Sequence, residues 1–100
     1  MIEDAARLVL REGGELSVEG SITINNVVAM VGQGIALFDR DNMVIDLARV
    51  TEVDSSAVSM LLEWQREAGR RNCPVRFANI PLNLRSLVQL YGLSELMHVA

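Results

Sequence analysis

The sequence predicts an α/β domain, a small mixed sheet with helices mainly on one face, in the order β-β-α-β-α-β-α. Two kinds of periodicity indicate this class. Apolar residues alternate with polar ones near the N-terminus, as in a half-buried strand, and recur at helical spacing in three later segments. Strand–helix–strand units require parallel neighbours and right-handed crossovers. One hundred residues suffice for one core, so we expect a single domain over residues 1–100.

The first two strands are predicted over residues 6–11 and 15–24. The first segment is rich in Leu and Val, and the second alternates in part between apolar and polar residues. Gly13 and Gly14 lie between them and offer a tight turn, because glycine tolerates positive φ. Gly20 indicates a bulge or bend within the second strand. Together the two segments predict a β-hairpin.

A first helix is expected behind Asn25 and Asn26, whose side-chain oxygens can accept free backbone N–H groups at a helix start. Gly32 and Gly34 each weaken this helix by roughly 1 kcal/mol relative to Ala, so it is irregular or packs closely against a neighbour. A polar turn is predicted over residues 39–42. The apolar stripe of the helix comprises Ile24, Val27, Val28, Val31, Ile35 and Phe38.

Residues 43–50 form a nearly continuous apolar run, which is typical of a central strand covered on both faces. Asp46 stands inside this run, and a buried charge needs hydrogen-bond partners or an exposed strand end. A second helix is predicted from about Ser56 to Arg71, with Trp64 interpreted as a core residue. The apolar stripe of this helix comprises Ala57, Val58, Met60, Leu61, Leu62, Trp64 and Ala68.

The C-terminal third predicts one further strand and one short helix. The strand is expected over residues 74–80, and Pro81 can open the helix as its first residue. Gly92 is a natural stop for that helix in the left-handed conformation. Residues 93–100 are expected to form a tail that ends in a short strand or helix.

Composition excludes several classes of function. The chain carries nine Arg, no Lys and 13 acidic residues, for a net charge of −4, which disfavours coating nucleic acid or an anionic membrane. Cys73 is the single Cys and His98 the single His, so no zinc site, internal disulfide or Ser/His/Asp triad is expected. The acidic residues 1–4 do not resemble a signal peptide. We therefore predict no enzyme, cofactor or metal.

The most informative stretch is Asp54-Ser55-Ser56, where the central strand meets the second helix. The carboxyl end of a strand is where sites form in open α/β sheets. One interpretation is helix capping alone, since each of the three residues can cap a helix. The other is a serine hydroxyl that accepts a phosphoryl group, because free N–H groups and the helix dipole stabilise a dianion. Asp46 and Asp54 would then oppose the added charge.

These residues carry a resemblance to a known family. Residues 44–47, 50 and 53–57, followed by a Leu-rich helix, resemble the motif of the STAS domain, the sulfate transporter and anti-sigma-factor-antagonist domain. Residues 84–93 are similar to the last helix of that family, and the resemblance covers roughly residues 6–97. It implies a sheet of four to five strands with helices on one face. In members that antagonise anti-sigma factors, it implies phosphorylation of the motif's second serine, Ser56 here, by a partner kinase.

The chain departs from the family pattern at two places. Ala57 replaces the glycine after the serines, and its methyl group would narrow a kinase's approach to the helix start. The usual Asp-Leu-Ser-Gly stretch reads Asp-Leu-Ala-Arg over residues 46–49. Asp46, which supports the motif, is thus retained while its neighbours differ.

The Ser-Ser-Ala variant, the run at residues 61–64 and the chain length are similar to one branch of the family. Members of that branch form the small cytoplasmic subunit of phospholipid-transport ABC complexes in Gram-negative bacteria. The resemblance implies contact with the ATPase subunit of such a complex through Asp54, Ser55, Ser56 and Ala57. It also implies a cytoplasmic location, peripheral to the inner membrane. The alternative is an anti-sigma-factor antagonist that binds an anti-sigma-factor kinase and is phosphorylated at Ser56, with Ser55 as a second candidate.

Overall fold

The computed structural model describes residues 6–38 and 43–100, and it confirms the predicted element order. One sheet has the strand order β1-β2-β3-β4, in which β1 is antiparallel to β2 and the other neighbours are parallel. The predicted polar turn at residues 39–42 and the acidic start at residues 1–4 lie outside the described residues. The elements are β1 (Ala6–Leu10), η1 (Glu12–Gly14), β2 (Leu16–Ile22), α1 (Val27–Ala36), β3 (Met43–Val53), α2 (Ser55–Arg70), β4 (Val75–Ala78), α3 (Leu82–Leu90) and η2 (Ser94–Leu96).

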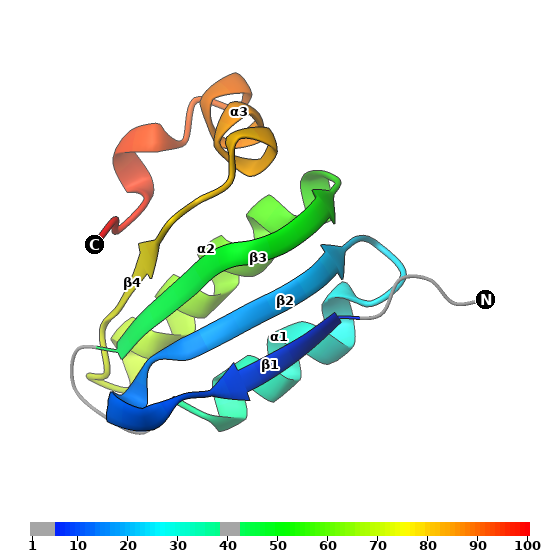
Figure 1. Cartoon of the computed structure of the whole chain (residues 1–100). Coiled ribbons are helices and arrows are strands. Elements are labelled where there is room, and N and C mark those ends of the chain that lie inside the picture. Colours follow the sequence, from blue (N-terminus) through cyan, green and yellow to red (C-terminus); the bar gives the residue numbers. More distant parts are fainter. Residues whose placement is uncertain (1–5, 39–42) are drawn as a thin grey trace.

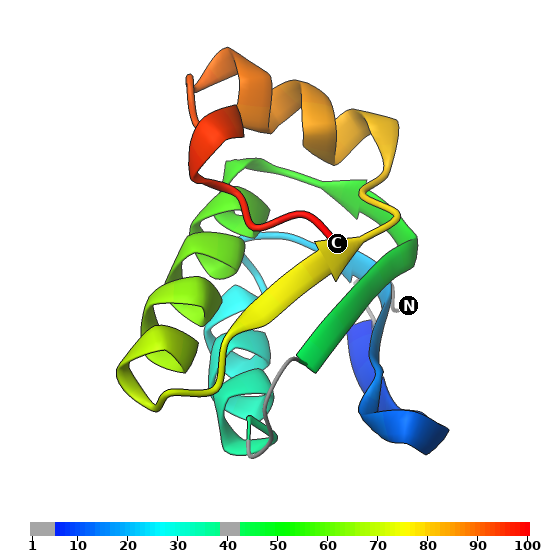
Figure 2. The same cartoon turned by 90° about the vertical axis from the view of Figure 1, so that its left-hand side faces the viewer.

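The sheet forms one layer and the two longer helices form a second. Helices α1 and α2 cover the same face of the sheet, and α3 lies across the end of the sheet (Figures 1 and 2). The core lies between the layers, because alternate strand residues point toward the helices. Its largest fully buried members include Trp64, Phe77, Leu16, Ile45 and Leu61. This arrangement confirms the prediction of helices mainly on one face.

The hairpin of β1 and β2 forms as predicted, and its glycines take the conformations that their positions require. Gly13 and Gly14 have φ values of 85° and 87° in the turn. Gly20 has φ of 96° and lies beside a register shift between β2 and β3, which confirms the predicted irregularity.

Helix α1 differs from its prediction at the start. Asn26 occupies the N-cap position but makes no side-chain cap bond. Its Oδ1 instead accepts from the N–H of Thr23 and its Nδ2 donates to the carbonyl of Ser21. The predicted stripe is also partly wrong, because Val28 is 83% exposed and Ile24 is 70% exposed. The helix itself carries apolar residues on several of its sides, so periodicity alone did not identify the buried side.

Helices α1 and α2 pack tightly around the Trp64 indole, which is fully buried as predicted. The indole Nε1 donates to the carbonyl of Val31 at 3.1 Å, and the ring meets Phe38 edge-on with centroids 6.1 Å apart. A Cβ atom on Gly34 would lie only 2.5 Å from the indole. Gly34 therefore allows the close approach that the sequence suggested.

The C-terminal part follows its prediction closely. Gly92 ends α3 with φ of 70°, although Pro81 occupies the N-cap and not the first helical turn. The tail then returns to β4, where Val99 bridges Phe77 in parallel orientation. The Gln65 side chain binds the backbone of the tail at two points, since its amide donates to the carbonyl of Leu96 and accepts from the N–H of His98.

Candidate functional site

The predicted motif lies where the carboxyl ends of β2 and β3 meet the starts of α1 and α2 (Figure 1). Asp54 is the N-cap of α2, with extended backbone. One carboxylate oxygen accepts from the N–H and the hydroxyl of Ser56. The other accepts from the N–H of Ile24 at 3.0 Å. Asp54 therefore caps α2 and also ties α2 to the segment that leads into α1.

These hydrogen bonds determine the ionisation of Asp54. The Ser56 hydroxyl and the N–H groups of Ile24 and Ser56 stabilise the carboxylate, and partial burial opposes them. The result is a pKa of Asp54 below its ordinary value. Asp54 is thus an anionic cap at the positive end of the α2 dipole, which is the favourable sign.

The two serines have different environments. Ser55 is exposed, and its hydroxyl makes no side-chain hydrogen bond with the described residues. Ser56 is half-buried and its hydroxyl donates to Asp54. Ser55 is therefore accessible at the surface, while Ser56 completes the cap.

Ala57 does not fulfil the two roles predicted for it. Its side chain is fully buried and belongs to the core cluster between the sheet and the helices. The methyl group therefore cannot narrow a kinase's approach, and it cannot touch a partner. The substitution of glycine by alanine acts on helix packing instead.

A shallow groove of about 450 Å³ runs beside the serines. Its walls come from the loop before α1, from α2 and from the segment after α3, and no charged side chain lines it within the described residues. Ile24 and Tyr91 line it and are 70% and 49% exposed. Val28 is a further exposed apolar residue, in the first turn of α1 and four positions after Ile24. We define the serine face by the residues Ile24, Val28, Ser55, Ser59, Leu62 and Tyr91.

Sequence reasoning missed the apolar part of the serine face. Ile24 and Val28 were assigned to the apolar stripe of the first helix, whereas both are mostly exposed. Tyr91, at the end of α3, lines the groove and is 49% exposed. Its approach to Ser55 depends on tertiary packing that no local pattern signals.

Asp46 lies away from the serines. Asp54 lies eight positions further along the chain, which corresponds to about 25 Å of extended strand. Its carboxylate accepts from the Arg11 guanidinium at 3.0 Å, from the Asn79 amide at 3.1 Å and from the N–H of Ala48 at 2.9 Å. The prediction that Asp46 would oppose charge at the start of α2 is therefore wrong.

The Asp46 partners explain how a buried carboxylate is tolerated within β3. Burial raises the pKa of Asp46, but hydrogen bonds from Ala48, Asn79 and Arg11 outweigh it, so the pKa lies below its ordinary value. Arg11 also donates to the buried hydroxyl of Ser17 at 3.0 Å. These side chains come from β2, β3 and the segments after β1 and β4, and they join all four strands.

The described residues contain no group of three or more His, Cys, Asp or Glu side chains placed to hold a metal ion. Among the same residues, no helix has both the length and the apolar character needed to cross a membrane.

Comparisons with known proteins agree with this fold. The family described as "Mlab, STAS domain" matches residues 9–98. The anti-sigma factor antagonist SpoIIAA in its unphosphorylated form is 19% identical over 96% of this chain and 88% of that chain, with a TM-score of 0.72. An anti-sigma factor antagonist from Mycobacterium paratuberculosis is 18% identical over 98% of this chain and 87% of that chain, with a TM-score of 0.82.

A third structural relative is the STAS domain of an antisigma-factor antagonist from Rhodobacter sphaeroides. It is 25% identical over 93% of this chain and 94% of that chain, with a TM-score of 0.56. No curated protein sequence matches significantly. Since the family match spans most of the chain and the solved structures share its fold, the chain belongs to the STAS-domain family.

Proposed function

We propose that this STAS domain is an MlaB-like subunit that binds the cytoplasmic ATPase subunit of a phospholipid-transport ABC complex. In that role it supports the assembly or activity of a complex that maintains outer-membrane lipid asymmetry. STAS domains are non-enzymatic interaction modules, and the matching family is the one described as Mlab. The proposal places the protein on the cytoplasmic side of the inner membrane, held there through the ATPase.

The serine face is the single observation that carries this proposal. Ile24 and Val28 are 70% and 83% exposed, and Tyr91 is 49% exposed across the groove. Clustered exposed apolar and aromatic groups around a central polar residue are typical of protein interfaces. Ser55 lies among these groups and is exposed, whereas Asp54 and Ser56 are hydrogen-bonded to each other. We infer that Ser55 and the apolar residues touch the partner and that Asp54 positions them.

Co-expression with the ATPase subunit, followed by affinity capture, tests the proposal. Val28→Asp and Ser55→Asp place a carboxylate on the serine face, and we expect each to weaken binding at least about tenfold, which corresponds to about 1.4 kcal/mol. Both positions are exposed, so the fold tolerates the change.

Leu10→Asp is the matched control, because Leu10 is 51% exposed and pairs with Leu16 at the opposite end of the sheet. It should bind like the wild type. Failure of the wild type to associate with the ATPase, or equal binding by all three variants, would contradict the proposal.

A second candidate function is that of an anti-sigma-factor antagonist that is switched by serine phosphorylation. The observation in its favour is the exposed Ser55 hydroxyl in the first turn of a 16-residue helix, where the dipole stabilises a phosphate. The family pattern indicates Ser56 as the acceptor, but the bond from Ser56 to Asp54 favours Ser55.

Incubation with the cognate kinase and ATP, followed by mass spectrometry, decides this candidate. Stoichiometric phosphate that Ser55→Ala abolishes and Ser56→Ala retains supports the switch at Ser55, and the reverse pattern supports it at Ser56. Absence of phosphate from the wild type rejects the candidate.

A further inference from the structure

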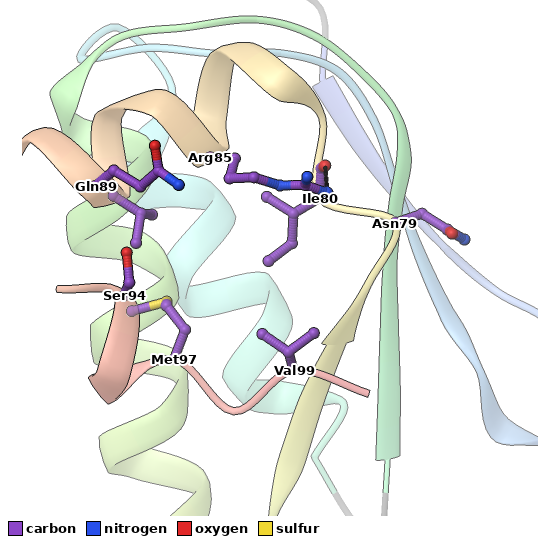
Figure 3. Close-up of a pocket in the computed structure, with 8 residues that line it drawn as sticks. Asn79, Ile80, Arg85, Gln89, Ser94, Met97 and Val99 are labelled. Atoms are coloured by element: carbon purple, nitrogen blue, oxygen red, sulfur yellow. Dashed lines mark hydrogen bonds between the residues drawn. The ribbon is translucent and has the colours of Figure 1, made fainter.

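A pocket of about 270 Å³ lies between the end of β4, helix α3 and the returning C-terminal tail (Figure 3). Its wall is mainly apolar and is formed by Ile80, Val88, Met97 and Val99. Val88 and Met97 are buried, so the inner wall is fixed by the core, while Val99 is 59% exposed at the mouth. The volume is slightly below the range of roughly 300–1,000 Å³ for ligand pockets, which indicates a small ligand.

The polar side of this pocket is positively charged. Arg85 is the only charged side chain among the described residues that line it. Arg85 forms no ion pair with any described residue, and its guanidinium contacts only the carbonyl of Ile80, at 3.4 Å. Gln89 follows one helical turn later and offers an amide on the same side of the pocket (Figure 3).

No acidic side chain among the described residues near the pocket pairs with Arg85. Asn79 belongs to the rim, but its amide donates to Asp46, and in Figure 3 it points away from the other lining side chains. Asp46 is itself paired with Arg11. Glu95 follows the lining residue Ser94 and does not itself line the pocket. Arg85 is exposed at the rim of the pocket, so an anion can reach its guanidinium from solvent. An unpaired guanidinium beside an apolar wall matches an anionic group attached to an apolar chain.

We propose that this pocket binds a small amphipathic carboxylate, with its apolar chain against Val88 and Met97 and its carboxylate on Arg85. The guanidinium fork suits a carboxylate because two parallel N–H groups can donate to its two oxygens. The cavity holds roughly nine water-sized groups, which is the size of a medium-chain fatty acid. The pocket shares no lining residue with the groove beside the serines, so this inference stands apart from the proposed function.

Titration of the ¹⁵N- and methyl-labelled protein with octanoate, followed by NMR, tests the proposal. We expect saturable shifts at Arg85, Val88, Met97 and Val99, and none at Ser55. Octanol and octylamine are the matched probes, because they keep the chain and remove or invert the charge. Each should bind about tenfold more weakly or worse, since a hydrogen bond to a charged group is lost.

Two variants distinguish an ion pair between octanoate and Arg85 from nonspecific binding of octanoate. Arg85→Gln should weaken octanoate binding about tenfold, and Arg76→Gln, which removes an exposed cation from β4 instead, should leave it unchanged. The spectra themselves report that each variant is folded. Absence of saturable shifts, equal binding of octanol, equal weakening by both variants, or shifts centred outside the pocket would overturn the proposal.

Discussion

Replacement of Gly34 by alanine tests the packing that brings α1 beside α2 and so forms one side of the serine face. The new Cβ would lie 2.5 Å from Cε2 and 2.6 Å from Nε1 of the Trp64 indole. Real Cβ atoms do not approach so closely, and the indole cannot give way easily because it is fully buried and bonded to Val31. Either the indole or the helix must therefore move.

The magnitude follows from three contributions. Overpacking a close-packed site costs about 1–3 kcal/mol. Loss of the indole hydrogen bond to Val31 leaves a buried donor unpaired and costs about 1–3 kcal/mol. The higher helix propensity of alanine relative to glycine stabilises the helix by about 1 kcal/mol and offsets part of this cost. Together these contributions amount to about 1–5 kcal/mol, so we expect Gly34→Ala to lower the free energy of unfolding by about 3 kcal/mol and the Tm by about 12–24 °C.

Gly32→Ala is the matched control, because Gly32 is exposed on the same helix and a Cβ there would meet nothing within 4 Å. It should raise the free energy of unfolding by about 0.5–1 kcal/mol through helix propensity alone. Urea unfolding followed by the fluorescence of Trp64, the single tryptophan, measures both variants. A Gly34→Ala protein as stable as the wild type would refute the close packing of α1 on α2.

Three further predictions concern the cap, the buried carboxylate and the tail. Asp54→Ala removes the α2 cap and the bond to Ile24, and should lower the free energy of unfolding by about 1–2 kcal/mol in urea titrations, whereas an unchanged midpoint would contradict the cap. Because the pKa of Asp46 is lower in the folded state than in the unfolded state, its stabilisation is present above about pH 4 and is lost as the pH falls further. Between pH 6 and about pH 2, the free energy of unfolding of Asp46→Asn should therefore depend less on pH than that of the wild type. Equal slopes of the free energy against pH in the two proteins would contradict this. Gln65→Ala removes both side-chain bonds to the tail, so residues 94–100 should become more susceptible to limited proteolysis, while unchanged cleavage would show that the tail does not depend on Gln65.

Most of the fold could be predicted from the sequence, because its signals are local. Glycine at positions 13, 14, 20 and 92 takes positive φ where turns, a bulge and a helix end require it. Alternation and helical spacing identified every strand and longer helix to within a few residues. The exposure of Val28 could not be predicted, since α1 carries apolar residues on several sides and only tertiary contacts select the buried one.

The helix cap at the site could be predicted from the sequence, whereas the groove and the accessible serine could not. The pattern Asp54-Ser55-Ser56 indicated a cap, and the structure confirms that Asp54 provides it. Which serine remains accessible depends on the bond between Ser56 and Asp54, and the groove depends on Tyr91, which is distant in sequence. Asp46 signalled a buried charge, but its partners Arg11 and Asn79 follow other strands, so they could not be identified from local sequence. Its distance from the serines, in contrast, follows from eight positions of extended strand.

Hydrogen exchange of the chain, alone and in complex with the ATPase subunit, is the most direct test of docking through the serine face. Complex formation should slow exchange at residues 24–28 and 55–62, which carry most of the serine face, and leave the β1–β2 hairpin at residues 6–19 unchanged. Protection confined to the hairpin, or no change at residues 24–28 and 55–62 in a complex that forms, would contradict docking through the serine face.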